Sequence, residues 1–481
     1  MKTIGQISKF LNLSCPQNIE NINIQSIVLD SRKCCQQSVF VALKGSLSDG
    51  NKYIQEVLSR GIPFVLTDNH ALDNSTNVRY VSNLKDNLCD LSQWFYDYKK
   101  PKNIIGVTGT NGKTSITNYI SQILDLASSK TLLLGTIGNG LYPDLEESTH
   151  TTLDTLSLYQ KIGMYKNFDN LVMEVSSHSL DQNRVKGLDF DMAVFCNLSH
   201  DHLDYHKTMD NYFLAKAKLF QGKNLKRAVI NIDDDYGRKL CDITTAKEIF
   251  RVSFLDKSAD IYLEQLNIES LQTNFKLFLK GQFLGQFSTN LIGEFNLMNI
   301  ALSLGVVENI IGIKKALENI SLIKPVKGRM ERIPLANGAV IVIDYAHTPD
   351  ALEKALLALI PYRSTKLWCL FGCGGNRDTT KRPEMAEIAE RYADKVIVTE
   401  DNSRLESFDS ILADIKKGFT NADKHIYINS REQAIKYSIE NAQAGDIILL
   451  AGKGHECYMD VNGVKEHFDE REKIAKYGVI V

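Results

Sequence analysis

From residue 103 onward the sequence repeats one pattern, in which a short apolar run is followed by a turn and a stretch of helical periodicity. The first such runs span residues 104–107, 171–175, 192–195 and 228–231. Runs that are apolar throughout and alternate with helices are typical of a parallel sheet that helices cover on both faces. The pattern restarts after residues 323–329, with further runs at 339–343, 366–371, 395–399 and 446–451. We therefore expect two doubly wound α/β domains, the second of them Rossmann-like.

The first hundred residues form a smaller segment of the same kind. Apolar runs at 27–29, 39–43 and 64–66 alternate with helical stretches, and the charged, proline-containing residues 98–102 follow as a linker. A chain of 481 residues is long enough for three domains at about 100–200 residues each. The sequence thus predicts a three-domain α/β protein divided into residues 1–100, 101–325 and 326–481.

Composition excludes several classes of function. Lys and Arg number 56 against 58 Asp and Glu, a net charge of −2, so nothing favours binding to nucleic acid or to an anionic membrane surface. No apolar run approaches the roughly 18 residues of a membrane span, and the N-terminus lacks the continuous apolar stretch of a signal peptide. The nine cysteines include no C-x-x-C pair, which argues against a disulfide framework and a cysteine-based zinc site. We expect a cytoplasmic enzyme that binds no nucleic acid and inserts into no membrane.

A glycine-rich segment lies between an expected strand at 104–108 and an expected helix at 114–127. Its sequence is Gly109-Thr110-Asn111-Gly112-Lys113-Thr114-Ser115. Glycines let backbone N–H groups turn toward an anion, and the N-terminus of the following helix adds partial positive charge. Lys113 would reach the β- and γ-phosphates of a nucleotide, and the Thr114 hydroxyl would bind Mg²⁺. Val107 stands where the strict spacing requires glycine, so this is a shortened phosphate loop that begins at Gly109, and it predicts ATP binding.

Acidic residues and histidines gather after two of the expected strands. Glu174 lies at the end of the apolar run at 171–175. The segment after the run at 192–195 holds three histidines and two aspartates within the seven residues 200–206. The carboxyl ends of parallel strands carry the ligand site of an open sheet. A metal ion near the phosphate loop is therefore expected.

Two metal chemistries remain open at this point. A binuclear hydrolase uses the motif H-x-H-x-D-H, which is one residue shorter than the H-x-H-x-D-x-H of this chain. The alternative is a Mg²⁺ ion on ATP, held by Thr114, Glu174 and one histidine among phosphate and water oxygens. The phosphate loop favours the second chemistry, with His202 as the ligand. His200 and His206 fit capping and loop-pinning roles better.

Seven strings along the chain together resemble the Mur ligase family. They are T-G-T-N-G-K-T-S (108–115), E-V-S-S-H-S-L-D-Q-N-R (174–184), N-L-S-H-D-H-L-D-Y-H (197–206), Y-F-L-A-K-A-K-L-F (212–220), G-E-F-N-L-M-N (293–299), D-Y-A-H-T-P-D (344–350) and L-A-G-K-G-H-E (450–456). The motifs occur in family order, and the resemblance extends from residue 28 to residue 456. The string at 174–184 is specific to the family members that add the third amino acid of the peptide. Folylpolyglutamate synthetases share the fold and the phosphate loop without it.

The resemblance implies an ATP-dependent ligase of peptidoglycan precursor synthesis, which serves cell wall biogenesis, cell shape and cell division. In this reaction the D-glutamate carboxylate of UDP-N-acetylmuramoyl-L-Ala-D-Glu takes the γ-phosphoryl group of ATP and becomes an acyl phosphate. The amine of an amino acid then attacks, and ADP and phosphate are left. The charge on the transferring phosphoryl group needs neutralisation by metal and lysine. ATP and Mg²⁺ are the implied cofactors, and the UDP-linked dipeptide and an amino acid are the implied partners of an expected monomer.

The same resemblance assigns roles to domains and residues. The domains would bind the UDP substrate (1–100), ATP (101–325) and the amino acid (326–481). The implied catalytic residues are Lys113, Glu174, His202 and Lys216, and the implied metal ligands are Thr114, Glu174, His202 and Lys216 as a carbamate (N6-carboxylysine). Carbamylation would give Lys216 a carboxylate-like group able to hold a second Mg²⁺. Without the resemblance, Lys216 would be assigned to a solvated helix face, and Lys218 is the neighbour that could be confused with it.

The resemblance also implies residues around each substrate. Besides the phosphate loop, Asn299, Arg329, Asp344 and His347 would surround ATP, although each taken alone fits a structural role better. The UDP-dipeptide site would use Ser31, Thr151, Thr152, Ser176, Gln182 and Arg184, and the amino-acid site would use Arg377, Asp401, Asn402, Ser403, Arg404, Gly452 and Glu456. Hydroxyls, an amide and a guanidinium suit a substrate with a diphosphate and free carboxylates. Leu153 follows the two threonines where the family has proline.

The identity of the amino acid depends on one short string. Family members that add meso-diaminopimelate carry D-N-P-R, and here Ser403 replaces the proline and removes its restriction on φ. Arg404 keeps the charge that would pair with the far carboxylate of this diacid, whereas a lysine donor would set its ammonium against Arg404. We therefore expect meso-diaminopimelate, with L-lysine as the alternative. A role for Arg404 as a helix cap also remains open.

Three classes of function can be separated by what their reactions require. A ligase releases phosphate only in the presence of both the UDP-dipeptide and an amino acid. A metal-dependent hydrolase needs no ATP, and another P-loop ATPase needs neither substrate. Because the nucleotide and amino-acid residues are expected on different domains, we also expect domain closure.

Overall fold

The computed structural model describes residues 1–45, 48–74, 76–148, 150–269 and 272–478. The chain divides into two compact units. Unit 1 comprises Met1–Ile105 and Ser129–Asp191, and unit 2 comprises Gly106–Ser128 and Met192–Val481. Strand β7 (Asn103–Thr108) begins in unit 1 and ends in unit 2.

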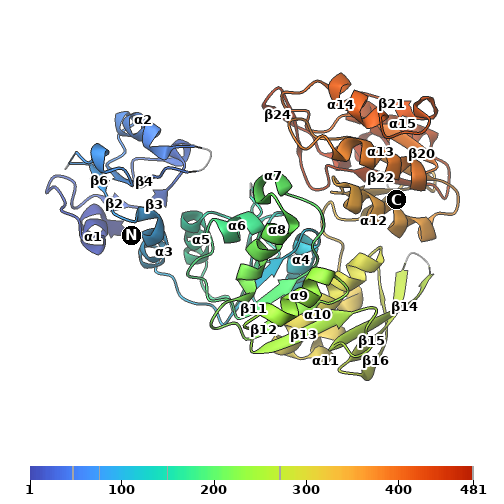
Figure 1. The fold of residues 1–481 in the computed structure, drawn as a ribbon, viewed down its shortest axis with the longest axis horizontal. Coiled ribbons are helices and arrows are strands. Elements are labelled where there is room, and N and C mark those ends of the chain that lie inside the picture. Colours follow the sequence, from blue (N-terminus) through green and yellow to red (C-terminus); the bar gives the residue numbers. More distant parts are fainter. Residues whose placement is uncertain (46–47, 75, 149, 270–271, 479–481) are drawn as a thin grey trace. The chain divides into compact units, whose positions relative to one another are not determined.

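The N-terminal part of unit 1 folds around a four-stranded parallel sheet of order β3-β4-β5-β6 (Figure 1). Its strands are β3 (Ser26–Val28), β4 (Ser38–Ala42), β5 (Phe64–Thr67) and β6 (Val78–Tyr80). The other elements are helices α1 (Ile4–Phe10), α2 (Ile54–Ser59) and α3 (Leu84–Phe95) and an antiparallel pair, β1 (Lys2–Thr3) and β2 (Asn23–Ile24). Alternate side chains of the buried strand β4 enter two cores, since Val39 packs into one and Phe40 into the other.

The rest of unit 1 supplies three further strands. In order they are β10 (Asn170–Glu174), β8 (Thr131–Leu134) and β9 (Asn139–Leu141), with β10 parallel to β8 and β9 antiparallel to β8. Helix α5 (Thr155–Met164) precedes β10 in the sequence and α6 (Ser177–Asp181) follows it. α5 packs against α3 and is capped by Asp154, which accepts hydrogen bonds from the N–H groups of Leu156 and Ser157.

Unit 2 contains a sheet of order β11-β12-β13-β14-β15-β16, whose first three strands are parallel. These strands are β11 (Met192–Phe195), β12 (Arg227–Asn231) and β13 (Glu248–Ser253). The helices of this part are α4 (Lys113–Leu126), α7 (Leu203–His206), α8 (Met209–Ala217), α9 (Asp235–Ile243), α10 (Glu294–Ile311) and α11 (Ile313–Leu317). α4 packs against α10, in which every residue from 296 to 307 is buried.

Strands β14 (Ile261–Glu269), β15 (Gln272–Leu279) and β16 (Gln282–Thr289) continue this sheet, and β15 is antiparallel to both of its neighbours. The pattern of continuous apolar runs did not predict them. Along β15 the buried side chains Phe275 and Leu277 alternate with half-buried polar ones such as Lys276. This period of two is typical of an antiparallel sheet with one solvated face, and it differs from the signal of a doubly covered parallel strand.

The C-terminal part of unit 2 forms a six-stranded sheet of order β17-β18-β22-β19-β20-β21, parallel except for β17. The strands are β17 (Glu331–Pro334), β18 (Val340–Asp344), β19 (Leu367–Phe371), β20 (Lys395–Val398), β21 (Ile426–Tyr427) and β22 (Ile447–Ala451). Its helices are α12 (Pro349–Leu359), α13 (Lys381–Tyr392), α14 (Phe408–Lys416), α15 (Arg431–Asn441) and α16 (Glu470–Tyr477), and β23 (Tyr458–Val461) pairs with β24 (Val464–His467) in a hairpin.

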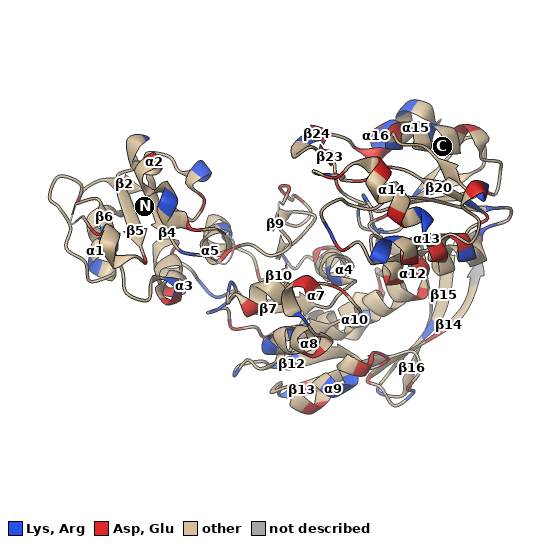
Figure 2. Ribbon diagram, turned by 45° about the horizontal axis from the view of Figure 1, so that its top comes forward, with Lys and Arg blue, Asp and Glu red and all other residues tan. Residues whose placement is uncertain are grey.

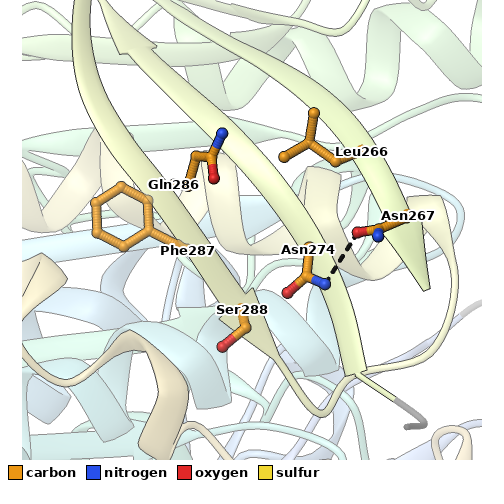
Figure 3. A pocket seen from close by; sticks show the side chains of 6 residues that line it. All are labelled: Leu266, Asn267, Asn274, Gln286, Phe287 and Ser288. Carbon is orange, nitrogen blue, oxygen red and sulfur yellow. Dashed lines mark hydrogen bonds between the residues drawn. The ribbon is translucent and has the colours of Figure 1, made fainter. Parts of the chain in front are cut away.

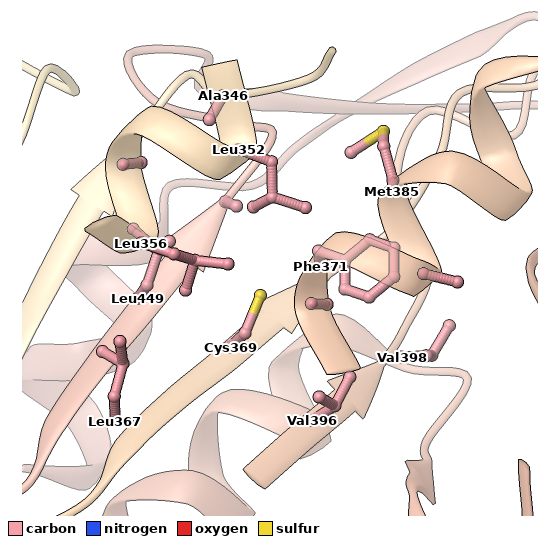
Figure 4. Packing of buried hydrophobic residues seen from close by; sticks show 14 of the residues in the cluster. Ala346, Leu352, Leu356, Leu367, Cys369, Phe371, Met385, Val396, Val398 and Leu449 are labelled. Atoms are coloured by element: carbon pink, nitrogen blue, oxygen red, sulfur yellow. The ribbon is translucent and has the colours of Figure 1, made fainter. Parts of the chain in front are cut away.

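Both faces of this six-stranded sheet are covered. Leu367 and Phe371 of β19 point into one core, where they meet Leu356 of α12 and Met385 of α13 (Figure 4). Trp368, between them in the sequence, lies in the second core on the opposite face. Alternate burial on two faces explains why β19 is apolar throughout, and it confirms the predicted α/β class.

Charged residues of both signs are interspersed along the ribbons of both units (Figure 2). Among the described residues, no helix combines the length and the hydrophobicity that a membrane span requires.

Candidate active site

The phosphate loop connects the end of β7 to the start of α4. Gly112 has φ +89°, and a Cβ atom there would lie 2.7 Å from Asn299 Oδ1. A Cβ atom at Gly109 would lie 2.9 Å from the side chain of Cys196. In the described chain no side chain caps the N-terminus of α4, whose helix dipole adds partial positive charge at the loop. Both glycines are therefore required by close packing, and the loop has the backbone arrangement of an anion site.

Residues that follow β11 hold the phosphate loop in place. Asn197 accepts a hydrogen bond at Oδ1 from Asn111 N (2.9 Å) and donates one from Nδ2 to Asn111 O (3.2 Å). The hydroxyl oxygens of Thr110 and Tyr212 lie 3.2 Å apart, and Ser199 N donates to Thr110 Oγ1 (3.1 Å). Sequence reasoning did not single out Asn197 or Tyr212, although each opens one of the strings that carry the family resemblance.

Two lysines converge on one carbonyl oxygen of the loop. Lys216 Nζ donates to Gly109 O (2.8 Å), and Lys113 Nζ donates to the same oxygen (2.9 Å) and to Thr110 O (2.8 Å). Lys216 lies in α8 with 1% of its surface exposed. Burial, reinforced by the charge of Lys113, lowers the pKa of Lys216 well below its ordinary value. Lys216 is thus a buried neighbour of the phosphate loop and does not lie on a solvated helix face.

The histidines after β11 have separate environments. His202 is half exposed, and its Nε2 lies 3.3 Å from Asp201 Oδ2. His206 is buried and stacks on Tyr212, with 5.0 Å between the ring centres. Within the described ranges, no three His, Cys, Asp or Glu side chains form a group that could hold a metal ion.

Asp201 is a further acidic residue at the loop that the sequence did not identify as functional. Burial raises its pKa, but electrostatic interaction with His202, His347 and Lys113 and a hydrogen bond from His202 N outweigh burial and lower the pKa below the ordinary value. The carboxylate therefore stays ionised at neutral pH.

Arg329 reaches the phosphate loop from the segment before β17. Its Nη2 donates to Thr114 Oγ1 (3.5 Å), and its guanidinium lies 4.5 Å from the ring centre of Tyr345. Its Nε is buried and, among the described residues, has no hydrogen-bond partner. Asn299, buried in α10, lies against Gly112 of the loop. The structure thus brings both residues to the phosphate loop.

Asp344 is the last residue of β18, and His347 lies in the segment that follows it. Asp344 Oδ2 accepts a hydrogen bond from Met330 N (2.8 Å), and burial raises the pKa of Asp344. His347 is half-buried, and desolvation together with the charge of Lys381 lowers its pKa. Lys381 Nζ donates to His347 O (2.9 Å), a contact that no motif suggested.

In unit 1, Glu174 and Thr151 share one partner. Thr136 donates from its backbone N to Glu174 Oε1 (2.7 Å) and from Oγ1 to Glu174 Oε2 (3.1 Å). The same hydroxyl lies 3.2 Å from Thr151 Oγ1. Gly135 makes this approach possible, since a Cβ atom there would lie 2.5 Å from Glu174 Oε1. Thr136 is therefore a site neighbour that sequence reasoning missed, and it lies in none of the recognised strings.

Four more of the expected substrate residues form one network with Glu174. Thr152 Oγ1 donates to Glu174 O (2.9 Å) and accepts from Ser176 N (3.1 Å). Arg184 donates from Nη1 to Thr152 O (3.3 Å) and from Nε and Nη2 to Gln182 Oε1 (2.9 and 2.6 Å). The structure thus brings together residues that are up to 33 positions apart in the sequence, from 151 to 184. Ser31 is buried at the start of a short helical turn after β3, and its carbonyl accepts from Arg60 Nη1 (3.0 Å).

The expected amino-acid residues lie beyond the carboxyl ends of β19, β20 and β22. Asn402 Nδ2 donates to Glu456 Oε2 (2.8 Å). Gly452 has φ +113°, and a Cβ atom there would lie 2.5 Å from Asp401 Oδ2. Lys453, fully buried, donates to Asn402 Oδ1 (3.0 Å) and Glu456 Oε2 (2.9 Å) and so joins two residues of this group. Lys453 lies inside the L-A-G-K-G-H-E string but was not predicted to take part.

Arg404 has φ +52° and donates from Nη1 to Gly375 O (2.8 Å) and Asn402 O (3.3 Å). It does not cap a helix, because Ser407 caps the following helix α14. Ser403 is buried, and Arg377 is exposed on the loop between β19 and α13.

An open hollow lies on the antiparallel strands β14, β15 and β16 (Figure 3). Its lining residues are Leu266, Asn267, Asn274, Gln286, Phe287 and Ser288. None of them is among the predicted site residues, so the hollow is separate from the groups described above.

Comparison with known proteins matches two segments of the chain to domain families. Residues 107–307 match the Mur ligase middle domain, and residues 328–454 match the glutamate ligase domain of Mur ligases. A Pseudomonas aeruginosa protein named UDP-N-acetylmuramoyl-L-alanyl-D-glutamate--2,6-diaminopimelate ligase is 40% identical over 97% of each chain. A Haemophilus influenzae protein of the same name is 38% identical and covers 95% of this chain and 96% of its own length.

Solved structures give the same picture. A structure of a UDP-N-acetylmuramoyl-L-alanyl-D-glutamate--2,6-diaminopimelate ligase aligns over 98% of both chains at 34% identity, with a TM-score of 0.65. The MurF ligase from Thermotoga maritima in complex with ADP aligns over 90% of this chain and 95% of its own, at 20% identity and a TM-score of 0.67. The second similarity shows the fold alone.

Proposed function

Because the chain belongs to the Mur ligase family, we propose that it is an ATP-dependent ligase that adds meso-diaminopimelate to the D-glutamate carboxylate of UDP-N-acetylmuramoyl-L-Ala-D-Glu. The reaction passes through an acyl phosphate and releases ADP and phosphate. The observation that carries the proposal is 40% identity over 97% of the chain to a relative of that name. In this proposal residues 1–100 bind the UDP group, residues 101–325 bind ATP, and residues 326–481 bind the amino acid.

ATP binding is supported by the donors around the phosphate loop. The N-terminus of α4 carries partial positive charge, and the ammonium of Lys113 and the guanidinium of Arg329 carry full positive charges. All three groups lie at the phosphate loop. The buried Nε of Arg329 lacks a hydrogen-bond partner within the described structure, and a buried donor of this kind is stabilised by an acceptor such as a phosphate oxygen. These groups would neutralise the phosphoryl group as it moves to the substrate carboxylate.

Mg²⁺ would be held by Thr114, Glu174, His202 and carbamylated Lys216, and it would supply charge neutralisation on the phosphates. The donor set fits a hard cation, since it offers a hydroxyl, carboxylate oxygens and one imidazole. The environment of Lys216 also fits carbamylation. Its lowered pKa favours the neutral amine, whose lone pair can attack CO₂, with loss of a proton to give the carbamate.

The UDP-dipeptide would contact Ser31, Thr151, Thr152, Ser176, Gln182 and Arg184. The network in unit 1 supports this assignment for the last five. Thr152, Ser176, Gln182 and Arg184 hydrogen-bond to one another or to Glu174, and Thr151 is linked to Glu174 through Thr136. Arg184 donates hydrogen bonds from Nη1 to Thr152 and from Nε and Nη2 to Gln182. It would therefore orient these two residues toward the peptide carboxylates and also supply positive charge.

For the amino acid, the geometry of Arg404 favours meso-diaminopimelate over lysine. Nη1 is used within the protein, while Nε and Nη2 donate to none of the described residues. One edge of the guanidinium is therefore anchored and the other can receive the far carboxylate of a diacid in a bidentate pair. Asp401, Asn402, Ser403, Arg377, Gly452 and Glu456 would complete this site. We further propose that the protein is a monomer in the cytoplasm. The cytoplasm is a reducing compartment, which fits the nine free cysteines.

The test is ADP release measured with ATP, Mg²⁺ and the UDP-dipeptide, with and without meso-diaminopimelate or L-lysine. The proposal expects release that requires both the dipeptide and meso-diaminopimelate. Release that requires the dipeptide and L-lysine, and does not occur with meso-diaminopimelate, would identify lysine as the amino acid that is added. Release that is indifferent to both substrates would identify another kind of ATPase.

A further inference from the structure

The two arginines assigned to the amino donor lie on separate loops. Arg377 belongs to residues 372–380, between β19 and α13, and Arg404 to residues 399–407, between β20 and α14. A diacid bound by both arginines requires a fixed distance between these loops. Neither loop has regular secondary structure to provide that distance, so side chains and loop backbone must provide it.

Glu406 joins the loops through a buried arginine. Its Oε1 and Oε2 accept hydrogen bonds from Nη1 and Nη2 of Arg382, both at 2.7 Å. Arg382 is the second residue of α13 and is fully buried. Glu406 Oε2 also accepts from Asn376 N (3.1 Å), in the loop of Arg377. One carboxylate therefore ties the Arg404 loop both to the start of α13 and to the residue that precedes Arg377.

Further hydrogen bonds connect the same two segments. Leu405 N donates to Asn376 Oδ1 (3.0 Å), and Gly375 N donates to Asn402 O (2.9 Å). Arg404 Nη1 donates to Gly375 O, as described above. Asn376 and Arg404 both have positive φ, at +51° and +52°. A backbone in this region persists only where its surroundings hold it. Asn376 is held by Leu405 and Glu406 of the opposite loop, whereas the backbone of Arg404 pairs with Asp460 O and Asn462 N.

The Glu406–Arg382 pair stays charged at any pH at which the protein would be assayed. Hydrogen bonding to Arg382, against a smaller effect of burial, lowers the pKa of Glu406 to about 2. Arg382 retains a second carboxylate, Asp414 Oδ2 at 3.0 Å, and the carbonyl of Gly374 at 3.3 Å. If residue 406 lost its charge, the buried guanidinium of Arg382 would still be paired with Asp414 and with the carbonyl of Gly374. We therefore expect the variant to fold, with changes in the two loops.

We infer that Glu406 is a positioning residue for the amino donor, which sets the relation between the Arg377 and Arg404 loops by bridging Arg382 and Asn376. The inference rests on the proposed function, since it assigns the two arginines to a diacid. Glu406 itself needs no contact with substrate. Its effect is on the selection of meso-diaminopimelate and on its KM, and not on phosphoryl transfer, to which Lys113 and Lys216 at the phosphate loop are assigned.

The variant Glu406→Gln keeps the shape of the side chain and removes its charge. We expect the KM for meso-diaminopimelate to rise at least 10-fold, while the KM values for ATP and the UDP-dipeptide and kcat change less than threefold. The preference for meso-diaminopimelate over lysine should fall by a similar factor. An unchanged KM for meso-diaminopimelate, or a fall in kcat alone, overturns the inference.

Glu432→Gln is the matched control. Glu432 lies in α15 and pairs at 2.8 Å with Lys473 and with Lys476, and these bonds lower its pKa to about 2 as well. It carries the same charge in the same part of the chain without touching either loop. Its loss should leave all three KM values unchanged, and an equal rise of KM for meso-diaminopimelate in both variants would show a general effect of charge and contradict the inference.

Amide hydrogen exchange of the ligand-free protein separates this inference from the proposed function. In Glu406→Gln, peptides covering 372–380 and 399–407 should exchange at least several-fold faster than in the wild type, and in Glu432→Gln they should not. Unchanged exchange in both loops contradicts the bridging role. A wild-type enzyme that uses lysine and ignores meso-diaminopimelate would overturn the proposed donor instead, while the exchange difference would still stand.

Discussion

Lys216 Nζ lies 2.8 Å from the carbonyl oxygen of Gly109, the first glycine of the phosphate loop, and Lys216 is 1% exposed. A buried ammonium with a second ammonium, that of Lys113, on the same oxygen is costly to the folded state. The folded chain therefore binds this proton less well than the unfolded chain, and stability rises with pH between the lowered pKa and the ordinary value of 10.5.

Lys216→Met removes that cost. Without added bicarbonate, we expect the free energy of unfolding at neutral pH to rise by about 1 kcal/mol or more, and its increase with pH to flatten. Ligase turnover should fall at least 100-fold, since the proposed carbamate is lost. Denaturant unfolding and ADP release measure the two effects, with Lys218→Met as the control expected to change neither. Turnover retained in Lys216→Met would contradict the assigned role.

Gly112→Ala and Gly281→Ala form a matched pair. Their φ values are similar, at +89° and +79°, so the backbone strain of alanine is about 1–2 kcal/mol at either position. Only at Gly112 does a Cβ atom meet another group, Asn299 Oδ1 at 2.7 Å; at Gly281 nothing lies within 4 Å. The KM for ATP should rise at least 10-fold in Gly112→Ala and stay unchanged in Gly281→Ala. Equal behaviour of the two variants would argue against a packed phosphate loop.

Lys113→Ala should reduce kcat by about 10²–10³-fold or more, because the transferring phosphoryl group loses a preorganised cation. The KM for meso-diaminopimelate should change little, since Lys113 contacts only the phosphate loop among the hydrogen bonds described above. Steady-state kinetics on a variant with a wild-type melting temperature measures this. A near-normal kcat would show that the nucleotide binds elsewhere.

Arg404→Ala should raise the KM for meso-diaminopimelate by about 10–100-fold, as expected for the loss of a charge-assisted hydrogen bond worth about 1.5–3 kcal/mol. The KM for the UDP-dipeptide should stay within threefold. Equal effects on the two KM values would refute the assignment of Arg404 to the amino acid.

His455 predicts a specific loss of stability in acid. Burial, with the charges of Arg329 and Arg471, lowers its pKa from 6.5 to about 3. The unfolded chain then binds the proton more readily, so the contribution of neutral His455 is present above pH 6.5 and is lost as the pH falls from 6.5 toward 3, at up to about 1.4 kcal/mol per pH unit. Unfolding of His455→Gln between pH 4 and 7 should depend less steeply on pH than that of the wild type. Identical slopes would exclude a buried, neutral His455.

The sequence predicted the strands that are buried on both faces, because these are apolar throughout. β11 spans the expected residues 192–195, while α4 begins and ends one residue before the expected 114–127. The antiparallel strands β14 to β16 were missed because their burial alternates. Resemblance supplied candidate site residues but not the contacts between them. Asn197, Thr136, Lys453 and Glu406 act by holding those candidates. Asn197 and Lys453 lie in recognised strings, but the contacts of all four are defined by distance in space, which a single sequence does not give.

The central claim is that the chain forms an amide bond between the UDP-dipeptide and meso-diaminopimelate. Its most direct test is mass spectrometry of the product after incubation with ATP, Mg²⁺, the UDP-dipeptide and an equimolar mixture of meso-diaminopimelate and L-lysine. We predict a UDP-linked tripeptide that carries diaminopimelate, with ADP in equal amount. A tripeptide that carries lysine, or ADP without any tripeptide, would contradict the claim.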